Sequence, residues 1–187
     1  MNANPSLQRY GLLSQLFHWS VVALMIGLVV TDKLRAGALK DTPERLEWLN
    51  LHMSLGILLF LIVIARIVWT RLSPQPAPLP GAQWTLIIAK LTHGLLNLAT
   101  LLVPIFGYLR AASKPRMSDF FGIQIPSVTG ELPWLNDAMH IFHGEPMEVF
   151  FYVVIALHVA AALWHQYYKH DGAIARMLPW GKVERTA

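Results

Sequence analysis

The chain has 187 residues, of which 55% are hydrophobic and only 14% are charged. Soluble domains carry about 25% charged residues, so this composition indicates an integral membrane protein. The absence of cysteine excludes disulfides, covalently attached haem, iron–sulfur clusters and thiolate zinc sites. The net charge is +4, but the Lys and Arg residues are scattered at the ends of apolar segments and form no basic patch, which argues against nucleic acid as a partner.

Four segments are long and apolar enough to cross the hydrocarbon core of a bilayer, which takes about 20 residues. They cover residues 12–31, 49–70, 84–109 and 147–168. The first lacks the basic leading region and cleavage site of a signal peptide, so we expect it to remain in the mature protein. The sequence therefore predicts a single all-α domain over residues 1–187, an up-down bundle of four transmembrane helices in contact with membrane lipid.

The connections between these segments differ in length. Residues 73–81, SPQPAPLPG, cannot continue a helix and predict a short, stiff turn between antiparallel second and third helices. Residues 32–48 and 110–145 form longer connections, and the second has the Gly and Pro spacing of an ordered loop over one membrane face. A slight excess of Lys and Arg places both termini, including a short C-terminal tail, in the cytoplasm.

Two histidines seven residues apart, His158 and His165, lie in the otherwise apolar stretch LHVAAALWHQYY. At about 1.5 Å per residue they lie two turns apart on one helical face. The small residues Ala161 and Ala162 between them leave a shallow groove that suits a flat macrocycle. An unpartnered imidazole in an apolar medium is costly, so we expect these side chains to have partners on other helices.

Two further histidines supply those partners, since His18 lies in the first span and His52 in the second. Their estimated depths pair His18 with His165 and His52 with His158. No Asp or Glu lies in the interior of the spans, which argues against a dimetal carboxylate site. Four imidazoles without carboxylates suit the iron of two haem groups, and bis-histidine ligation leaves no open position for dioxygen, so such haems transfer electrons. The alternative is that these histidines form hydrogen bonds between helices.

Other polar residues of the spans have two interpretations. His93, on the third helix, is either a hydrogen-bonding partner for a haem propionate or a quinone, or a packing residue. Arg66 and Arg71, at the end of the second helix, are typical of side chains that extend to the membrane surface, and the alternative is that they hold haem propionates.

The long connection before the fourth helix carries its own candidates. His140 and His143 are either solvated loop residues or contacts to haem or quinone. Lys114 and Arg116 form a small basic cluster on the presumed outer face, where they are candidates for attracting an anionic substrate.

Four stretches of the sequence together resemble the bacterial cytochrome b561 family of dihaem membrane proteins. They are QRYGLLSQLFHW, LHMSLGILLFLIVIARIVWTR, GYLRAASKPRMSDFFGIQIP and LHVAAALWHQYYKHDGAIARMLP. The resemblance runs from about Arg9 to Pro179 and implies two haem b groups. It puts the axial ligands on His18, His52, His158 and His165, and His93 also matches a family histidine. His143 is the nearest match to a family histidine that begins helix four, although its spacing to His158 is one residue longer.

The resemblance also implies a function. Some members of the family are superoxide oxidases, which pass electrons from periplasmic superoxide to ubiquinone, and others are electron carriers. We therefore expect an inner-membrane dihaem cytochrome between a periplasmic donor, with superoxide as a candidate, and the ubiquinone pool. The alternatives are a non-catalytic electron-transfer subunit that docks through residues 110–145, and a haem-free metal-binding bundle. A homodimer is compatible with all three.

Overall fold

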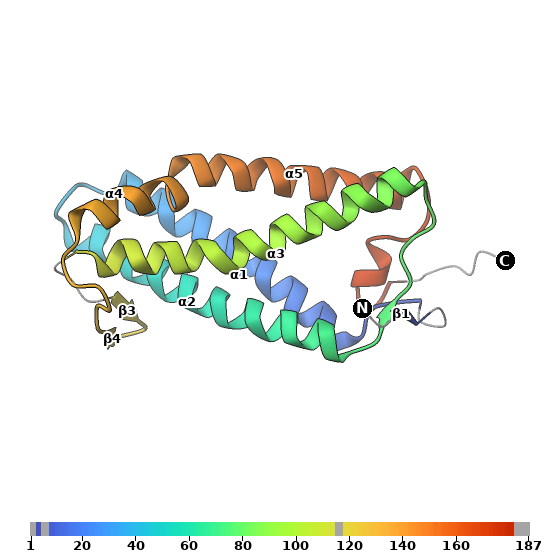
Figure 1. Cartoon of the computed structure of the whole chain (residues 1–187), viewed down its shortest axis with the longest axis horizontal. Coiled ribbons are helices and arrows are strands. Elements are labelled where there is room, and N and C mark those ends of the chain that lie inside the picture. Colours follow the sequence, from blue (N-terminus) through green and yellow to red (C-terminus); the bar gives the residue numbers. More distant parts are fainter. Residues whose placement is uncertain (1–2, 5–7, 115–117, 182–187) are drawn as a thin grey trace.

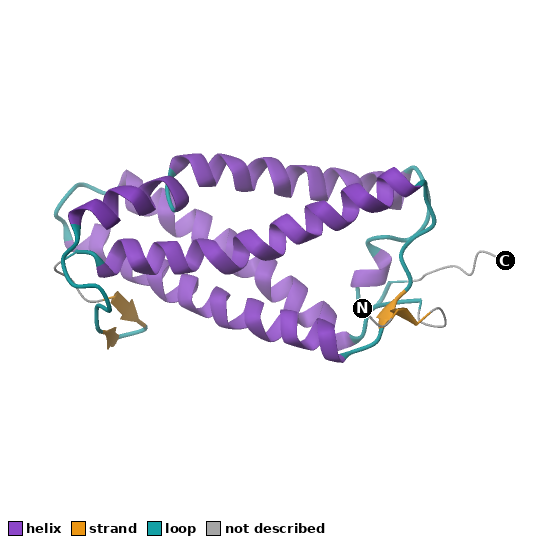
Figure 2. Cartoon of the chain, viewed as in Figure 1, coloured by secondary structure: helices purple, strands orange, loops and turns teal. Residues whose placement is uncertain are grey.

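The computed structural model describes residues 3–4, 8–114 and 118–181. It is mostly helical, and its long helices run side by side along the longest axis of the molecule (Figure 1, Figure 2). The helices are α1 (Leu12–Gly37), α2 (Pro43–Leu72), α3 (Gln83–Ala112), α4 (Pro133–Phe142) and α5 (Glu145–Tyr167), followed by the 3-10 turn η1 (Ala175–Met177). Short strand pairs lie at the two ends, β1 (Ala3–Asn4) with β2 (Gln75–Pro76) and β3 (Ser118–Phe120) with β4 (Ile123–Ile125).

Four helical segments of the described chain are long and apolar enough to cross a membrane, which confirms the predicted all-α class with four spans. Their surfaces fit this role, because large apolar side chains point away from the protein. Ile26, Leu61, Ile87 and Leu157, one from each span, are more than half exposed. Lipid tails are as apolar as these side chains, so their exposure carries no penalty in a bilayer. The chain is a multi-pass membrane protein.

The helices extend beyond the apolar stretches that predict them. α1 continues past Thr31 to Gly37, and the guanidinium of Arg35 pairs with the carboxylate of Asp32 at 2.6 Å within this extra turn. α2 begins at Pro43, six residues before its predicted start, where the hydroxyl of Thr42 accepts a hydrogen bond from the backbone N–H of Arg45. Proline at the first helical position and Thr at the N-cap are typical of a helix start.

The closest packing joins α1 to α2, while α5 contacts chiefly α3 and α4. Val21, Leu59 and Val63 form the buried core between the first two helices. α1 and α5 have little direct backbone contact, although both carry histidines. The bundle is thus tight on one side and looser on the side where the histidines of α1 and α5 meet.

The predicted loop over residues 110–145 is largely ordered. It contains the β3–β4 hairpin, which the buried hydroxyl of Ser54 on α2 holds by donating to the carbonyl of Asp119 and accepting from the N–H of Phe121. It also contains α4, a separate helix that the sequence did not predict, which packs on α3 and leads through Gly144 into α5. We call this end of the bundle the hairpin end.

The opposite end, which carries Tyr10 and Arg176, is here called the terminal end. Arg176 fastens it, since its guanidinium donates to the carbonyls of Gln8 and Ala77. The indole N–H of Trp19 donates to the carbonyl of Met177 at 2.8 Å, so η1 lies against α1. Both described ends of the chain therefore meet at one end of the bundle (Figure 1).

Candidate functional site

Two imidazoles face each other near the hairpin end. His52 lies on α2 and His143 lies between α4 and α5, and their ring centroids are 6.1 Å apart with the ring planes at 74°. This is the hairpin-end pair.

Backbone carbonyls orient both rings of the hairpin-end pair. Nδ1 of His52 lies 3.1 Å from the carbonyl oxygen of Leu28 and 3.2 Å from the hydroxyl of Thr31. Nδ1 of His143 lies 2.9 Å from the carbonyl oxygen of Val103. A carbonyl only accepts, so each Nδ1 carries the proton and donates it. The Nε2 lone pair of each ring then remains available for a metal, which is the arrangement that metal-bound histidines use.

His143 reaches this position because α3 has a glycine opposite it. A Cβ atom at Gly107 would come within 2.5 Å of the His143 ring, closer than any side chain tolerates. Arg110, one turn further along α3, donates from its guanidinium to the carbonyl of His143 at 2.7 Å. The space left at Gly107 and the hydrogen bond from Arg110 together hold His143, which lies between α4 and α5 and belongs to neither helix.

A second group of imidazoles lies toward the terminal end. The ring of His18 on α1 faces that of His158 on α5, with centroids 6.3 Å apart and planes at 67°. His93 on α3 approaches His158 more closely, at 5.1 Å between centroids, and its Nδ1 donates to the carbonyl of Ala89 at 2.7 Å. We call these three residues the terminal-end trio.

The trio is held less firmly than the hairpin-end pair. Nδ1 of His18 is buried and has no hydrogen-bond partner. The guanidinium of Arg66, on α2, lies close enough to all three imidazoles for their charges to interact. An orphaned buried nitrogen and an arginine inside an apolar span are costly features, and each is typical of a functional site.

The structure pairs the rings differently from the sequence expectation. His18 faces His158 instead of His165, and His52 faces His143 instead of His158. Nδ1 of His165 lies 2.5 Å from the carboxylate of Asp171, in the turn that follows α5. The expected pairs came from depth alone, counted along one continuous fourth helix. In the structure His158 lies at the level of His18, so His165, seven residues further along α5, lies about 10 Å beyond it.

The other predicted site residues lie in different surroundings. Arg71 is exposed in the last turn of α2, whereas Arg66, five residues earlier on the same helix, interacts through its charge with His18. Lys114 is exposed just after α3, and Arg116 lies outside the described residues. His140 is exposed on the last turn of α4.

Sequence reasoning gave His143 only an uncertain role and gave Arg110 none. The signal for His143 was its match to the family histidine at the start of helix four, but the spacing to His158, one residue longer than expected, weakened this match. The signal for Arg110 was weaker, since one arginine at a helix end resembles any membrane-surface anchor. Only the approach of His143 to Gly107 shows why both matter.

The two facing pairs have the spacing that bis-histidine ligation requires. Metal–imidazole bonds are about 2 Å long, so two rings on opposite sides of one ion have centroids roughly 6 Å apart. The separations of 6.1 and 6.3 Å match, whereas the 5.1 Å between His93 and His158 is too short. Among the described residues, no group of three or more His, Asp or Glu side chains could hold a bare metal ion. Two opposed imidazoles fit an ion whose remaining ligands come from a macrocycle, as in haem.

Comparisons with known proteins agree with this chemistry. The model of the family described as prokaryotic cytochrome b561 matches residues 9–180. Cytochrome b561 homolog 2 of Escherichia coli (strain K12) is 29% identical over an alignment of 189 positions, which covers 95% of this chain and 95% of its own. Cytochrome b561 homolog 1 of the same organism is 26% identical over 87% of this chain and 92% of its own. A protein named probable superoxide oxidase CybB, from Yersinia pestis, is 26% identical over 92% of this chain and 97% of its own.

Proposed function

Since the chain belongs to the prokaryotic cytochrome b561 family, whose members are membrane b-type cytochromes that transfer electrons, we propose that it holds two b haems and carries electrons between them across the membrane. The main support for this proposal is the presence of two facing imidazole pairs, His52 with His143 and His18 with His158. His18 and Leu28, which contacts His52, are ten residues apart on α1, so the pairs lie about 15 Å apart along the bundle.

Haem iron with two imidazole ligands supplies one-electron transfer when it is bound. The protein's own residues would then set its position. Leu28, Thr31 and Val103 orient the hairpin-end imidazoles through their Nδ1 atoms. Arg66 brings a positive charge to the terminal-end trio, where it would balance a haem propionate, and His93 presents a free Nε2 beside His158. This assigns to Arg66 the role that the sequence also considered for Arg71.

The proposal also names an electron donor and an electron acceptor. One relative is named a probable superoxide oxidase, and two cationic side chains at the end of α3, Arg110 and Lys114, suit an anionic donor. The charge of Arg110 interacts with the imidazole of His143, and Lys114 is exposed just after the end of α3, whereas Arg35 is paired with Asp32. We propose that superoxide gives its electron at this end, on the periplasmic face of the inner membrane, and that ubiquinone accepts electrons at the cytoplasmic terminal end. Two superoxide ions, one quinone and two protons then give two dioxygen molecules and one quinol.

Two measurements on the detergent-purified protein test this proposal. The pyridine haemochrome assay should give two b haems per chain, and one haem or none would contradict the dihaem assignment. Superoxide generated enzymatically should reduce a short-chain ubiquinone in the presence of the protein. The rate should fall as salt is added, because salt screens the attraction between superoxide and the cationic side chains of the protein. Absence of any quinone reduction would overturn the assignment of donor and acceptor.

The non-catalytic subunit remains a second candidate because of one observation. The hairpin end exposes several large apolar side chains, namely Phe121, Ile123, Val128 and Trp134. Such a patch is typical of protein–protein contacts. If the chain is such a subunit, a partner enzyme should reduce its two haems, and the purified chain should show no turnover of superoxide and quinone. The partner, or a second copy of this chain, would then bind at this surface.

A further inference from the structure

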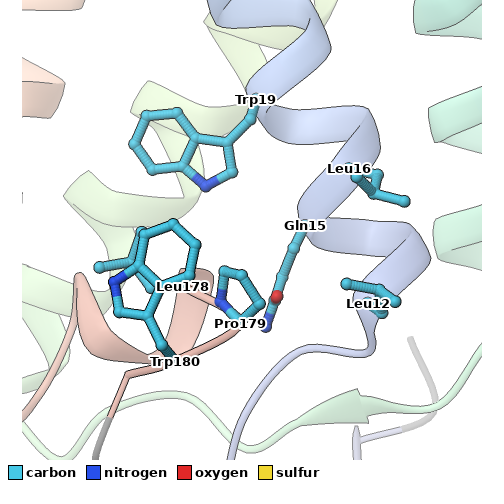
Figure 3. A pocket seen from close by; sticks show the side chains of 7 residues that line it. All are labelled: Leu12, Gln15, Leu16, Trp19, Leu178, Pro179 and Trp180. Carbon is cyan, nitrogen blue, oxygen red and sulfur yellow. The ribbon is translucent and has the colours of Figure 1, made fainter.

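The two ends of the bundle present apolar surface in different ways. At the terminal end, Leu12, Leu16 and Trp180 line a pocket between α1 and the segment after η1, and the surface exposed in it is apolar and identifies no ligand (Figure 3). At the hairpin end, Phe121 and Ile123 lie on the β3–β4 hairpin, which packs on α2, and are 57% and 65% exposed. The geometry of the hairpin indicates what these two side chains face.

The tip of the hairpin is a two-residue turn that places an aromatic side chain at a strained position. Phe120 pairs with Ile123, so the turn consists of Phe121 and Gly122, with φ angles of 49° and 87°. Such turns favour Asn followed by Gly, because a positive φ is uncommon for a bulky residue. In water, Phe121 would be unfavourable twice, through its backbone and through its exposed ring. An apolar medium around the ring would offset these costs.

The polar groups of the turn have their partners inside the protein. The backbone N–H of Phe121 donates to the hydroxyl of Ser54 at 2.9 Å, and that of Gly122 donates to Oδ1 of Asp119 at 3.0 Å. The other carboxylate oxygen of Asp119 accepts from the side-chain amide of Gln124 at 2.8 Å. Both N–H groups of the turn are therefore satisfied without water. A segment that enters the hydrocarbon region of a bilayer must meet this condition.

The contact with Ser54 fixes the depth of the hairpin. Ser54 is 1% exposed on α2 and lies five residues inside the apolar stretch 49–70, about 7.5 Å from its start. Its hydroxyl bonds the backbone on both sides of Phe120, so the turn lies near this level. α1 gives the same boundary, since Leu28, whose carbonyl lies against His52, is three residues from the end of its own apolar stretch.

We propose that the β3–β4 hairpin is a membrane anchor, whose tip inserts Phe121 and Ile123 among the lipid acyl chains beside α2. Lipid surrounds the bundle at this level, and burial of apolar side chains in it is favourable. This assignment removes Phe121 and Ile123 from the surface that a partner protein could use, and leaves Val128 and Trp134. Because Ser54 follows His52 by two residues on α2, the anchor also sets how far the hairpin-end pair lies below the membrane surface.

The reactivity of single cysteines tests this proposal, in nanodiscs that each hold one copy of the haem-loaded protein. The chain has no cysteine, so an introduced thiol is the only target of a charged maleimide, which stays in water. Ile123→Cys places the thiol at the tip. Val128→Cys is the matched control, because Val128 is 70% exposed at the same end of the bundle. It follows Ser127, whose hydroxyl donates to the carbonyl of Ala112, three residues beyond the apolar stretch of α3.

Ile123→Cys should react at least about tenfold more slowly than Val128→Cys, because a thiol in apolar surroundings stays protonated and unreactive. After denaturation in sodium dodecyl sulfate, both variants should react at the same rate, which shows that both thiols are intact. Equal rates in the nanodiscs would overturn the proposal, since the tip would then lie in water and be open to a partner protein. With one copy in each nanodisc, neither a partner nor a second copy can protect the thiol.

Phe121→Asn, added to Ile123→Cys, separates the ring from the turn. Asn tolerates a positive φ, so the turn should keep its shape while the aromatic side chain is lost. The thiol should then react at least about threefold faster, because less apolar burial holds the tip in the bilayer. The haem content should stay the same. An unchanged rate would overturn the anchoring role of Phe121. Labelling rates do not depend on electron transfer, so this proposal and the proposed function fail separately.

Discussion

The two imidazole pairs differ in what holds their rings. In the hairpin-end pair, both Nδ1 atoms donate to helix carbonyls, and a glycine and an arginine fix the backbone of His143. In the terminal-end trio, Nδ1 of His18 has no partner, and the conspicuous polar neighbour is the charged Arg66. The first site is thus preorganised by hydrogen bonds, whereas the imidazole of His18 in the second has no such bond at Nδ1.

The largest effect should come from Gly107→Ala. The added methyl group would collide with the His143 ring, so the ring must leave its position and the hairpin-end haem should be lost. Alanine is a better helix former than glycine by about 1 kcal/mol, so loss of helix stability cannot explain the result. The haem content per chain measures the change. Gly37→Ala, where nothing lies within 4 Å, is the control and should keep both haems.

Arg66→Gln should leave both haems in place but shift the potential at the terminal end. A positive charge favours the reduced state of the iron, so its removal should lower the midpoint potential by an amount on the order of tens of millivolts. A redox titration followed by visible spectra measures the shift. An unchanged potential at both centres would show that Arg66 faces away from the haem.

Thr31→Val should have the smallest effect. The hydroxyl of Thr31 lies near Nδ1 of His52, but the carbonyl of Leu28 remains as an acceptor after the change. With one acceptor fewer, the imidazole is slightly less basic, so the potential of the hairpin-end haem should rise by less than the Arg66 shift. The same redox titration measures it, and a shift at the terminal-end haem instead would contradict the assignment of His52.

Hydropathy predicted the four spans because length and apolar content decide membrane insertion. It ended α1 six residues early, since Asp32 and Arg35 lower the hydropathy although their ion pair stabilises the extra turn. The pairs expected from depth differ from the facing rings in the structure, because the direction in which an imidazole points depends on the rotation of its helix as well as on its depth. The role of His143 depends on contacts with Gly107 and Arg110, which are distant from it in the sequence.

The most direct test of the account is the haem content of two variants, His143→Ala and His165→Ala, by the pyridine haemochrome assay. The geometry predicts that His143→Ala keeps one haem, since His52 loses its opposite ligand. It predicts that His165→Ala keeps both, because His165 pairs with Asp171 outside the imidazole pairs. The reverse result, with a haem lost in His165→Ala and both retained in His143→Ala, would contradict the proposed ligand pairs and favour the pairs expected from depth.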